Sequence, residues 1–324
     1  EKNEAFGIVE KIKELSSHYS YSDFEILYRT NAQSRVLEQC LRDEGIPYTI
    51  IGGVRFYERK EIKDILAFLR VLVNPNDSLS LKRVLKTFAE GIGAKTILKI
   101  EEFAFKNNKT LLESLFEKKL VNGLPSKAKN SILQIAQIIK ELDELKDKLT
   151  VNELTEKIIE KTKYLDTLLL EKTEEAETRA ENVKELISAT TEFKERHPNP
   201  TLENFLEEVS LITNIDRWDS SQESVNLMTL HSAKGLEFPI VFVCGLEEGL
   251  FPLSRSMDTL AELEEERRLF YVGMTRAKEK VFLAYAKKRK RFGEMLNLKS
   301  RFLDEIPEEL IEIENFEEII VPLR

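Results

Sequence analysis

The sequence predicts an α/β protein in which one parallel-sheet domain is built from two chain segments and an all-α domain is inserted between them. Strand-like and helix-like patterns alternate at the start of the chain, give way to helical patterns alone, and return near Val225. Such alternation is typical of parallel sheets. Because insertion at exposed loops is well tolerated, we expect three parts, residues 1–73, 74–221 and 222–324.

The first part alternates helices with short strands. Residues 1–15 carry apolar side chains at helical spacing, and the run FEILY at 24–28 is a short apolar strand. A helix follows the polar stretch after this strand. A second strand over 48–51 and a helix from about 58 to 73 complete the part.

The middle of the chain is predicted to be helical throughout. It opens with the turn sequence NPNDS at 74–78, and residues 132–145 place apolar side chains on one helical face. The polar stretch 214–224 has the composition of a linker. Further helices are expected over about 151–170, 178–196 and 201–213.

The sheet pattern resumes in the last part of the chain. Apolar strands over 225–230 and 239–244 enclose a polar loop, and a helix near 260–272 leads to a strand over 280–286. The basic run KKRKR at 287–291 fits a solvated hairpin tip or a nucleic-acid contact.

Composition limits the possible functions. The 324 residues include 58 acidic and 49 basic side chains, for a formal net charge of −9. Proteins that bind nucleic acid with their whole surface are usually basic, so we expect any such site here to be a local groove. Cys40 and Cys244 lie in apolar runs without metal-ligand spacing, which fits a reducing cytoplasm. No apolar run approaches the roughly 18–20 residues of a membrane span, so no membrane partner is expected.

The polar loop between the two late strands concentrates groups that can carry chemistry. It contains His231, Ser232, Lys234 and Glu237, and Gly235 permits a positive φ or a close backbone approach. Open α/β sheets bind ligands at the carboxyl ends of their strands, where we expect this loop to lie. An ordinary polar loop is an equally consistent interpretation.

Two arginines are candidate phosphate ligands. Arg29 directly follows a strand and could donate to a phosphate backbone, although its stretch could equally cap a helix through Asn31. Arg276 is expected at the tip of a helix that ends near Gly273, where a guanidinium can bind phosphate with fixed geometry. Spacing alone favours pairing of Arg276 with the glutamates at 264–266.

A glycine-rich turn lies in the helical part, formed by Gly91, Ile92 and Gly93. Its amides could cradle a phosphate at a helix start, but a lone GIG is more often a plain turn between helices. The sequence has no G-x-x-x-x-G-K-[ST] pattern and no Walker B layout. We therefore expect that this chain alone binds neither ATP nor Mg²⁺ firmly.

These segments together resemble the carboxyl-terminal half of superfamily 1 DNA helicases of the UvrD/PcrA/Rep family. The order and spacing of the matching stretches fit the family, and the resemblance covers essentially the whole chain. It implies that the two α/β parts form a RecA-like motor domain and that the insertion is its accessory domain. The matching stretches are LYRTNAQSR at 27–35, IGGVRFYERKEIKDILAFLR at 51–70, EGIGAKTI at 90–97, LMTLHSAKGLEFPIVFVCGLEEGLFP at 227–252 and EEERRLFYVGMTRAKEK at 264–280.

The resemblance implies a nucleotide site shared with another domain. Arg276 would be the arginine finger that reaches the γ-phosphate of ATP, where charge accumulates in the transition state. Glu237 would accept hydrogen bonds from the ribose hydroxyls. ATP and Mg²⁺ would be bound in the full-length enzyme, between this domain and an amino-terminal RecA-like domain of the same polypeptide.

The resemblance also implies contacts with DNA. Thr229, His231 and Arg29 would contact single-stranded DNA, and Gly91 to Gly93 would touch the duplex at the junction. Glu90 departs from the family, which commonly has arginine there, and an acidic side chain repels phosphate.

The implied activity is ATP-dependent 3′→5′ translocation and unwinding in DNA repair or replication, with repair proteins as partners and no activity of this chain alone. One alternative is the motor part of a recombination-type helicase–nuclease subunit, although no nuclease domain follows the motor segments in this sequence. The other is a non-catalytic module that binds DNA or protein.

Overall fold

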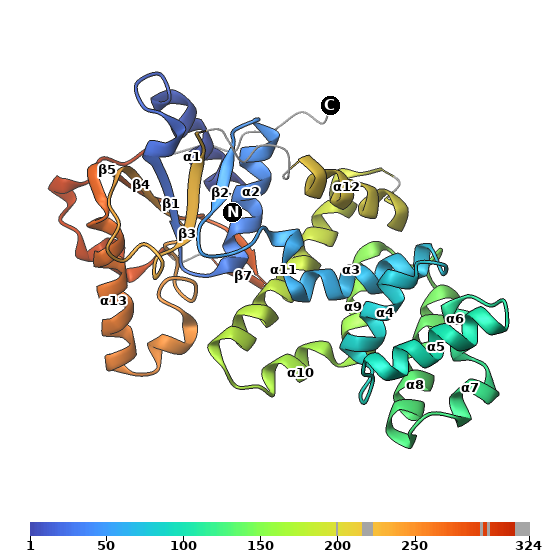
Figure 1. Cartoon of the computed structure of the whole chain (residues 1–324). Coiled ribbons are helices and arrows are strands. Elements are labelled where there is room, and N and C mark those ends of the chain that lie inside the picture. Colours follow the sequence, from blue (N-terminus) through green and yellow to red (C-terminus); the bar gives the residue numbers. More distant parts are fainter. Residues whose placement is uncertain (199, 216–222, 292–293, 297–298, 315–324) are drawn as a thin grey trace. The chain divides into compact units, whose positions relative to one another are not determined.

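The computed structural model describes the chain except for residues 199, 216–222, 292–293, 297–298 and 315–324. It divides into two compact units, one formed by Glu1–Phe56 with Arg217–Arg324 and the other by Tyr57–Asp216. The first unit contains a parallel sheet and the second is built of helices (Figure 1). The predicted α/β fold, with a sheet domain in two chain segments and a helical insertion, is confirmed.

The sheet has five parallel strands in the order β2-β3-β1-β4-β5. The central strand β1 comes from the first chain segment, and both of its neighbours, β3 and β4, come from the second. Neither segment can therefore form this sheet without the other. The strands are β1 Phe24–Tyr28, β2 Tyr48–Ile50, β3 Val225–Thr229, β4 Phe238–Val243 and β5 Ala277–Leu283, and a separate antiparallel pair joins β6 Arg289–Arg291 to β7 Glu294–Leu296.

Helices cover both faces of the sheet (Figure 1). Helices α1 (Lys2–Leu15) and α2 (Ser34–Asp43) pack on one face with Phe24, Ile26 and Tyr28 of β1. Helix α13 (Leu260–Met274) packs on the other face, where Leu27 of β1 meets Phe270 of the helix. All five residues of β1 are buried, as expected for a strand covered on both sides. Each large apolar side chain buried in this way stabilises the fold by about 1.5–3 kcal/mol.

The helical unit is organised around α3 (Lys60–Val73). Ten of its 14 residues are buried, and it packs against α4, α8, α9, α11 and α12. Its acidic groups are satisfied within the unit, since Asp64 accepts hydrogen bonds from Arg83 and from the hydroxyl of Tyr164. The other helices are α4 Ser78–Phe88, α5 Ala94–Lys106, α6 Leu111–Leu115, α7 Lys118–Asn122, α8 Ser126–Asp143, α9 Val151–Thr162, α10 Tyr164–Leu169, α11 Glu174–Arg196 and α12 Leu202–Ile215.

The unit boundaries differ from the predicted ones at the first junction. The sequence prediction assigned α3 to the sheet domain, whereas in the structure it belongs to the helical unit. The reason is that α3 is buried among helices on most of its sides, including at Glu61 and Asp64, and the spacing of its apolar residues does not show which unit buries it. Most of the predicted linker over 214–224 lies outside the described residues. In the described part of the chain, no helix has the length and apolar character needed to cross a bilayer.

Candidate nucleotide and nucleic-acid site

The loop between β3 and β4 runs from the side of the sheet where the strands end to the side where they begin. We call these the carboxyl edge and the amino edge of the sheet. The strands are parallel, with Tyr28 level with Thr229 and Phe24 level with Ile240. Thr229 therefore ends β3 at the carboxyl edge, whereas Glu237 precedes β4 at the amino edge. The expectation that Glu237 lies at the carboxyl edge is wrong, because a connection between parallel strands must return along the sheet before the next strand begins.

Apolar residues of this loop attach it to the α13 face of the sheet. Leu230 and Ala233 are fully buried in the same cluster as Phe270 of α13. A Cβ atom at Gly273 would lie 2.4 Å from Cδ2 of Leu230, so the end of α13 packs directly on the turn after β3. A larger residue at this position would force the Leu230 side chain to move. The contact lies near candidate site residues on both elements. Leu230 lies between Thr229 and His231, and Gly273 lies three residues before Arg276.

Arg276 lies beside the backbone of Glu237 at the amino edge. Its Nη1 donates to the carbonyl of Leu236 at 2.8 Å, and its Nε donates to the carbonyl of Val272 at 3.0 Å. The amide of Phe238 donates to the Arg276 carbonyl at 2.9 Å, which aligns the starts of β4 and β5. The structure thus brings together the two residues for which the sequence resemblance implied contacts with nucleotide.

The structure excludes the alternative pairing of Arg276 with the glutamates of α13. Glu265 pairs with Arg268 at 2.8 Å, Glu264 pairs with Arg267, and Glu266 pairs with Arg29. The helix ends at Met274 with Thr275 as its cap, as predicted from Gly273. Arg276 follows the cap and points back along the last turn.

The loops that follow β1, β2 and β3 meet at the carboxyl edge near Thr229. The hydroxyls of Thr229 and Ser232 lie 2.9 Å apart, and a Cβ atom at Gly52 would lie 3.3 Å from Oγ of Ser232. Gly52 has a φ of +72° and closes β2, so the loops after β2 and β3 are side by side. His231 is exposed in the turn. Hydroxyls and an imidazole at an open edge are suited to contact a nucleic-acid backbone.

Gly52 and Gly53 were not among the sequence-based candidates for this edge. A Cβ atom at Gly53 would lie 4.0 Å from Oδ1 of Asn31, in the loop after β1. The pair therefore lies between the loops after β1 and β3. Two glycines directly after a strand were the available sequence signal, since such residues permit close approach of a ligand or another backbone.

Arg29 is held by α13. Its Nε lies 3.0 Å from each carboxylate oxygen of Glu266, and its Nη2 lies 2.6 Å from Oε1. The side chains are 14% and 6% exposed, and Glu266 also accepts from the amide of Leu253 at 3.3 Å. Nε and Nη2 of the guanidinium are therefore engaged by the helix that ends beside Arg276, and a phosphate would compete with Glu266 for these two donors.

The turn after β1 is capped by a different residue from the one expected. The carboxamide oxygen of Gln33 accepts from the amides of Arg29 at 2.9 Å and Thr30 at 2.8 Å. Thr30 caps the short 3₁₀ helix over Asn31–Gln33, so the prediction of Asn31 as the cap is wrong. A cap at this position leaves the Arg29 side chain free to turn toward α13.

The glycine-rich turn belongs to the helical unit. Gly91 has a φ of +75°, and Gly93 is the N-cap of α5. Both glycines are exposed and Ile92 is half-buried. Glu90 lies 2.8 Å from Nζ of Lys127, whose hydrogen bond holds the pKa of Glu90 below its usual value. The ion pair reduces the negative charge that Glu90 presents beside this turn.

Arg289, in the basic run, is buried in a cluster of carboxylates. Its Nε lies 2.8 Å from Glu247, its Nη2 donates to Glu4, and Glu4 also accepts from the amide of Gly245 at 2.6 Å. The run 287–291 does enter an antiparallel strand pair, β6 with β7, and Lys287 and Lys288 are exposed. The Arg289 side chain differs from both sequence interpretations, because it points into the protein instead of toward solvent or nucleic acid. It joins the start of α1 to the loop after β4.

A buried carboxyl lies on the central strand. Glu25 is fully buried and sits on the α13 face of β1, between Asn226 and Val241 of the neighbouring strands. Within the described residues neither of its carboxyl oxygens has a hydrogen bond of normal geometry. Burial raises the pKa of Glu25 to about 8, and the nearby Asn226 amide offsets only part of that rise.

This burial predicts a stability that falls as the pH rises. Between the usual value of 4.5 and about 8, the folded protein keeps a proton that the unfolded chain releases. The free energy of unfolding should therefore decrease through this range, in total by on the order of 3–5 kcal/mol. Glu25→Gln should match the wild type near pH 5 and be more stable near pH 9, measured by urea unfolding. Glu265→Gln, at an exposed glutamate, is the control. If the free energy of unfolding of Glu25→Gln depended on pH in the same way as that of the wild type, the prediction would be contradicted.

Across the described residues, no group of three or more His, Cys, Asp or Glu side chains is arranged to hold a metal ion. Arg276 and Glu237 offer a guanidinium and a carboxylate, which fit the phosphate and ribose ends of a nucleotide.

Comparison with known proteins identifies the family of this chain. Residues 1–288 match the family model described as the UvrD-like helicase C-terminal domain. The ATP-dependent DNA helicase PcrA of Bacillus subtilis is 46% identical over 298 residues, which are 90% of this chain and 40% of the relative. PcrA of Staphylococcus epidermidis is 42% identical over 318 residues, 96% of this chain and 43% of the relative. The chain spans about two fifths of the length of these relatives. On its sequence and its parallel-sheet fold, this chain belongs to the UvrD-like helicase C-terminal domain family.

Proposed function

We propose that this chain is the carboxyl-terminal part of an ATP-dependent DNA helicase that moves 3′→5′ along single strands in DNA repair or replication, in the cytoplasm. The relatives are named as ATP-dependent DNA helicases. The observation that supports the proposal most is the placement of two pairs of residues. Arg276 and Glu237 adjoin at the amino edge of the sheet, and Thr229 and His231 lie at the carboxyl edge of β3.

The amino-edge pair is suited to the two ends of a nucleotide. The guanidinium of Arg276 would approach the γ-phosphate and stabilise the charge that develops in the transition state. The carboxylate of Glu237 would accept hydrogen bonds from the ribose. ATP with Mg²⁺ supplies the phosphoryl chemistry when bound, and the P-loop that holds it would come from an amino-terminal RecA-like domain of the same polypeptide.

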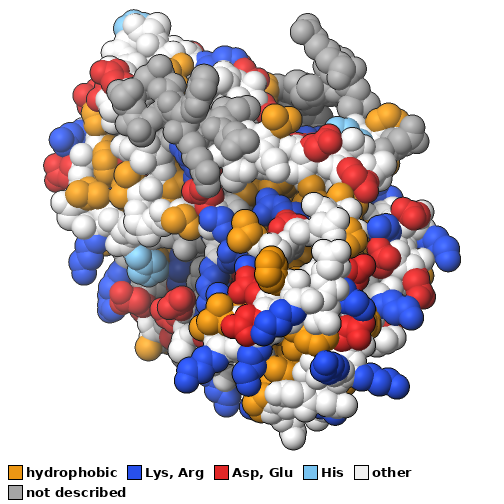
Figure 2. Space-filling model, turned by 45° about the vertical axis from the view of Figure 1, so that its right-hand side comes forward, with side chains coloured by type: hydrophobic (Ala, Val, Ile, Leu, Met, Phe, Trp, Pro, Cys, Tyr) orange, Lys and Arg blue, Asp and Glu red, His pale blue; other side chains and the backbone are white. Residues whose placement is uncertain are grey.

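The carboxyl edge is suited to hold single-stranded DNA loosely. Thr229 and His231 would contact its backbone, and Arg29 would join them only if its pair with Glu266 opened. On the face shown in Figure 2, basic side chains are interspersed with acidic ones. A net charge of −9 and a few local donors favour a weak contact, along which a strand can slide. The turn from Gly91 to Gly93 would meet the duplex at the junction.

Coupling between the edges would pass through the contact of α13 with the loop. Gly273 packs on Leu230. Leu230 directly follows Thr229 in the sequence, and Gly273 precedes Arg276 by three residues. A shift of Arg276 toward nucleotide would move the end of α13 against this turn. Because the end of α13 is in direct contact with Leu230, the turn would move with the helix and alter the position of Thr229. This path is a physical hypothesis for how nucleotide changes the contact with DNA.

The isolated 324-residue chain is expected to hydrolyse no ATP, with or without single-stranded DNA. The reason is that its sequence offers an arginine finger but no P-loop. Release of phosphate, measured with and without an oligonucleotide, checks this against the full-length enzyme as the positive control. Substantial DNA-stimulated hydrolysis by the isolated chain would contradict the proposal.

A further inference from the structure

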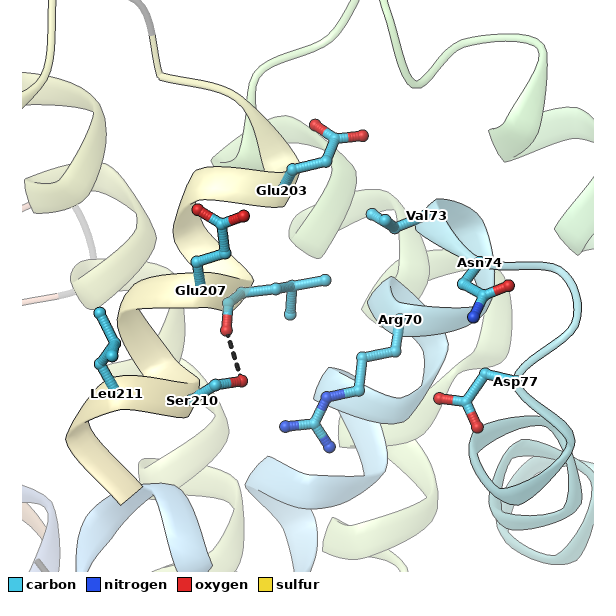
Figure 3. Close-up of a pocket in the computed structure, with 9 residues that line it drawn as sticks. Arg70, Val73, Asn74, Asp77, Glu203, Glu207, Ser210 and Leu211 are labelled. Carbon is cyan, nitrogen blue, oxygen red and sulfur yellow. Dashed lines mark hydrogen bonds between the residues drawn. The ribbon is translucent and has the colours of Figure 1, made fainter. Parts of the chain in front are cut away.

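An open groove in the helical unit lies between the end of α3 and the helix α12. Its volume is about 540 Å³. Val73 of α3 lines it on one side, with Leu206 and Leu211 of α12 on the other (Figure 3). Leu206 is buried, but Leu211 is 63% exposed. An exposed leucine that lines a groove is an apolar surface left uncovered in the isolated chain.

Charges of opposite sign line the two sides of the groove. Arg70 extends from α3 into the space between the helices, and Glu203 and Glu207 lie one turn apart on α12 (Figure 3). Within the part of the chain that the structure describes, none of these three side chains makes a hydrogen bond or an ion pair, although the charge of Arg70 acts on Asp77 and that of Glu203 acts on Lys146. Charges on opposite sides of a groove that do not reach each other can be satisfied by a ligand that lies in the groove.

Asp77 closes one end of the groove and is already committed. Its carboxylate caps α4 by accepting from the amide of Ser80 at 3.0 Å and from its hydroxyl at 2.6 Å. Although burial opposes its ionisation, these hydrogen bonds and the charge of Arg70 hold the pKa of Asp77 below its usual value. Asp77 therefore remains charged and fixes the shape of this end, without being available as a ligand group.

We propose that this groove binds an amphipathic helix of a partner protein. A large apolar side chain of the partner would insert between α3 and α12 and cover Leu211. A basic side chain would face Glu203 and Glu207, and an acidic side chain would face Arg70. A helix that presents an apolar anchor to a groove between helices is a common mode of peptide recognition. The inference does not depend on the helicase function proposed above.

The charges of the groove disfavour other occupants. Three carboxylates, those of Asp77, Glu203 and Glu207, surround one guanidinium, so the groove repels a nucleic-acid backbone. A symmetric pair of copies would place this acid-rich groove against the same acid-rich groove of the other copy. A partner with both signs of charge avoids both costs.

The proposal can be tested with peptides selected for binding, so that the natural partner need not be known. A displayed library of helical peptides is selected against the full chain, with the Leu211→Lys chain as the counter-selection. We expect the enriched peptides to carry one apolar anchor between a basic and an acidic residue. A synthetic peptide of the enriched sequence should bind Leu211→Lys at least about tenfold more weakly than the wild type. Leu170→Lys, which changes a leucine that is 76% exposed outside the groove, is the matched control and should bind normally.

A charge exchange tests the orientation of the bound helix. Glu207→Lys should weaken the peptide about tenfold, and replacing the basic residue of the peptide with glutamate should restore the affinity. A structural disturbance would not be rescued in this way. The proposal is overturned if no peptide is enriched over the counter-selection, or if the exchanged peptide fails to recover. It is also overturned if an oligonucleotide displaces the peptide, or if light scattering shows a dimer that Leu211→Lys abolishes.

Discussion

Replacing Arg276 with alanine in the full-length enzyme is expected to lower ATP turnover by about 10³–10⁵-fold and to leave ATP binding largely unchanged. The guanidinium interacts with charge that develops on the phosphoryl oxygens during transfer, so its loss affects the transition state more than the bound nucleotide. Its place beside the Leu236 carbonyl orients it at the edge where Glu237 lies. Arg276→Lys should be nearly as inactive, because an ammonium lacks the fixed fork of donors.

DNA-stimulated phosphate release and the affinity for a fluorescent ATP analogue measure the two effects separately. The control is Arg268→Ala on the same helix, since this side chain is 71% exposed and pairs with Glu265 of α13. Arg276 also donates to two backbone carbonyls, so the thermal unfolding midpoint of the variant must be compared with that of the wild type. Turnover that survives in a folded Arg276→Ala enzyme would show that the finger is another residue.

Replacing Arg289 with alanine is expected to lower the free energy of unfolding of the sheet unit by about 3–5 kcal/mol. Its side chain is 11% exposed, and the carboxylates of Glu4 and Glu247 that surround it are 6% and 4% exposed. Removing the cation takes away the positive charge that balances two buried carboxylates and leaves them the backbone amides of Gly245 and Ala286 as donors. The cost of those charges is much larger than the net value of the intact cluster.

Urea unfolding followed by circular dichroism measures this change. Amide hydrogen exchange of the sheet residues then shows whether the loss of stability lies in the sheet unit. Lys287→Ala is the control, because Lys287 is exposed in the same basic run and should change stability by less than about 0.5 kcal/mol. Combining Arg289→Met with Glu4→Gln and Glu247→Gln should recover part of the loss, since the uncompensated charges are then gone. Equal, small effects of Arg289→Ala and Lys287→Ala would refute the structural role of the cluster.

Local patterns predicted most of the elements, with characteristic errors. The runs FEILY and VNLMT are apolar and short, and both are strands where expected. The strand β5 begins at Ala277, before the predicted residue 280, because its first residues are charged and exposed. This strand is at the edge of the sheet, where one side of the ladder is unpaired and lysine side chains are favoured. The alternation of buried and exposed residues that would reveal it is therefore absent.

The sequence by itself determined the fold class, the two-segment arrangement and the resemblance through which Arg276, Glu237, Thr229 and His231 became candidates. Periodicity and motifs are local properties, and these residues lie in long matching stretches. The comparisons confirm the family from the same information. What the residues do in the enzyme stays a proposal.

Only the tertiary structure decided which of these groups lie together. Arg29 binds Glu266, 237 residues away in the sequence, and Arg289 binds Glu4, 285 residues away. Neither pairing has a local signature, because both depend on two chain segments interleaving in one sheet. The same interleaving places Thr229 at one edge and Glu237 at the other, since β1 lies between β3 and β4 and the connecting loop must return along the sheet. Strand order and direction are consequences of long-range burial and backbone pairing, which no short stretch of sequence encodes.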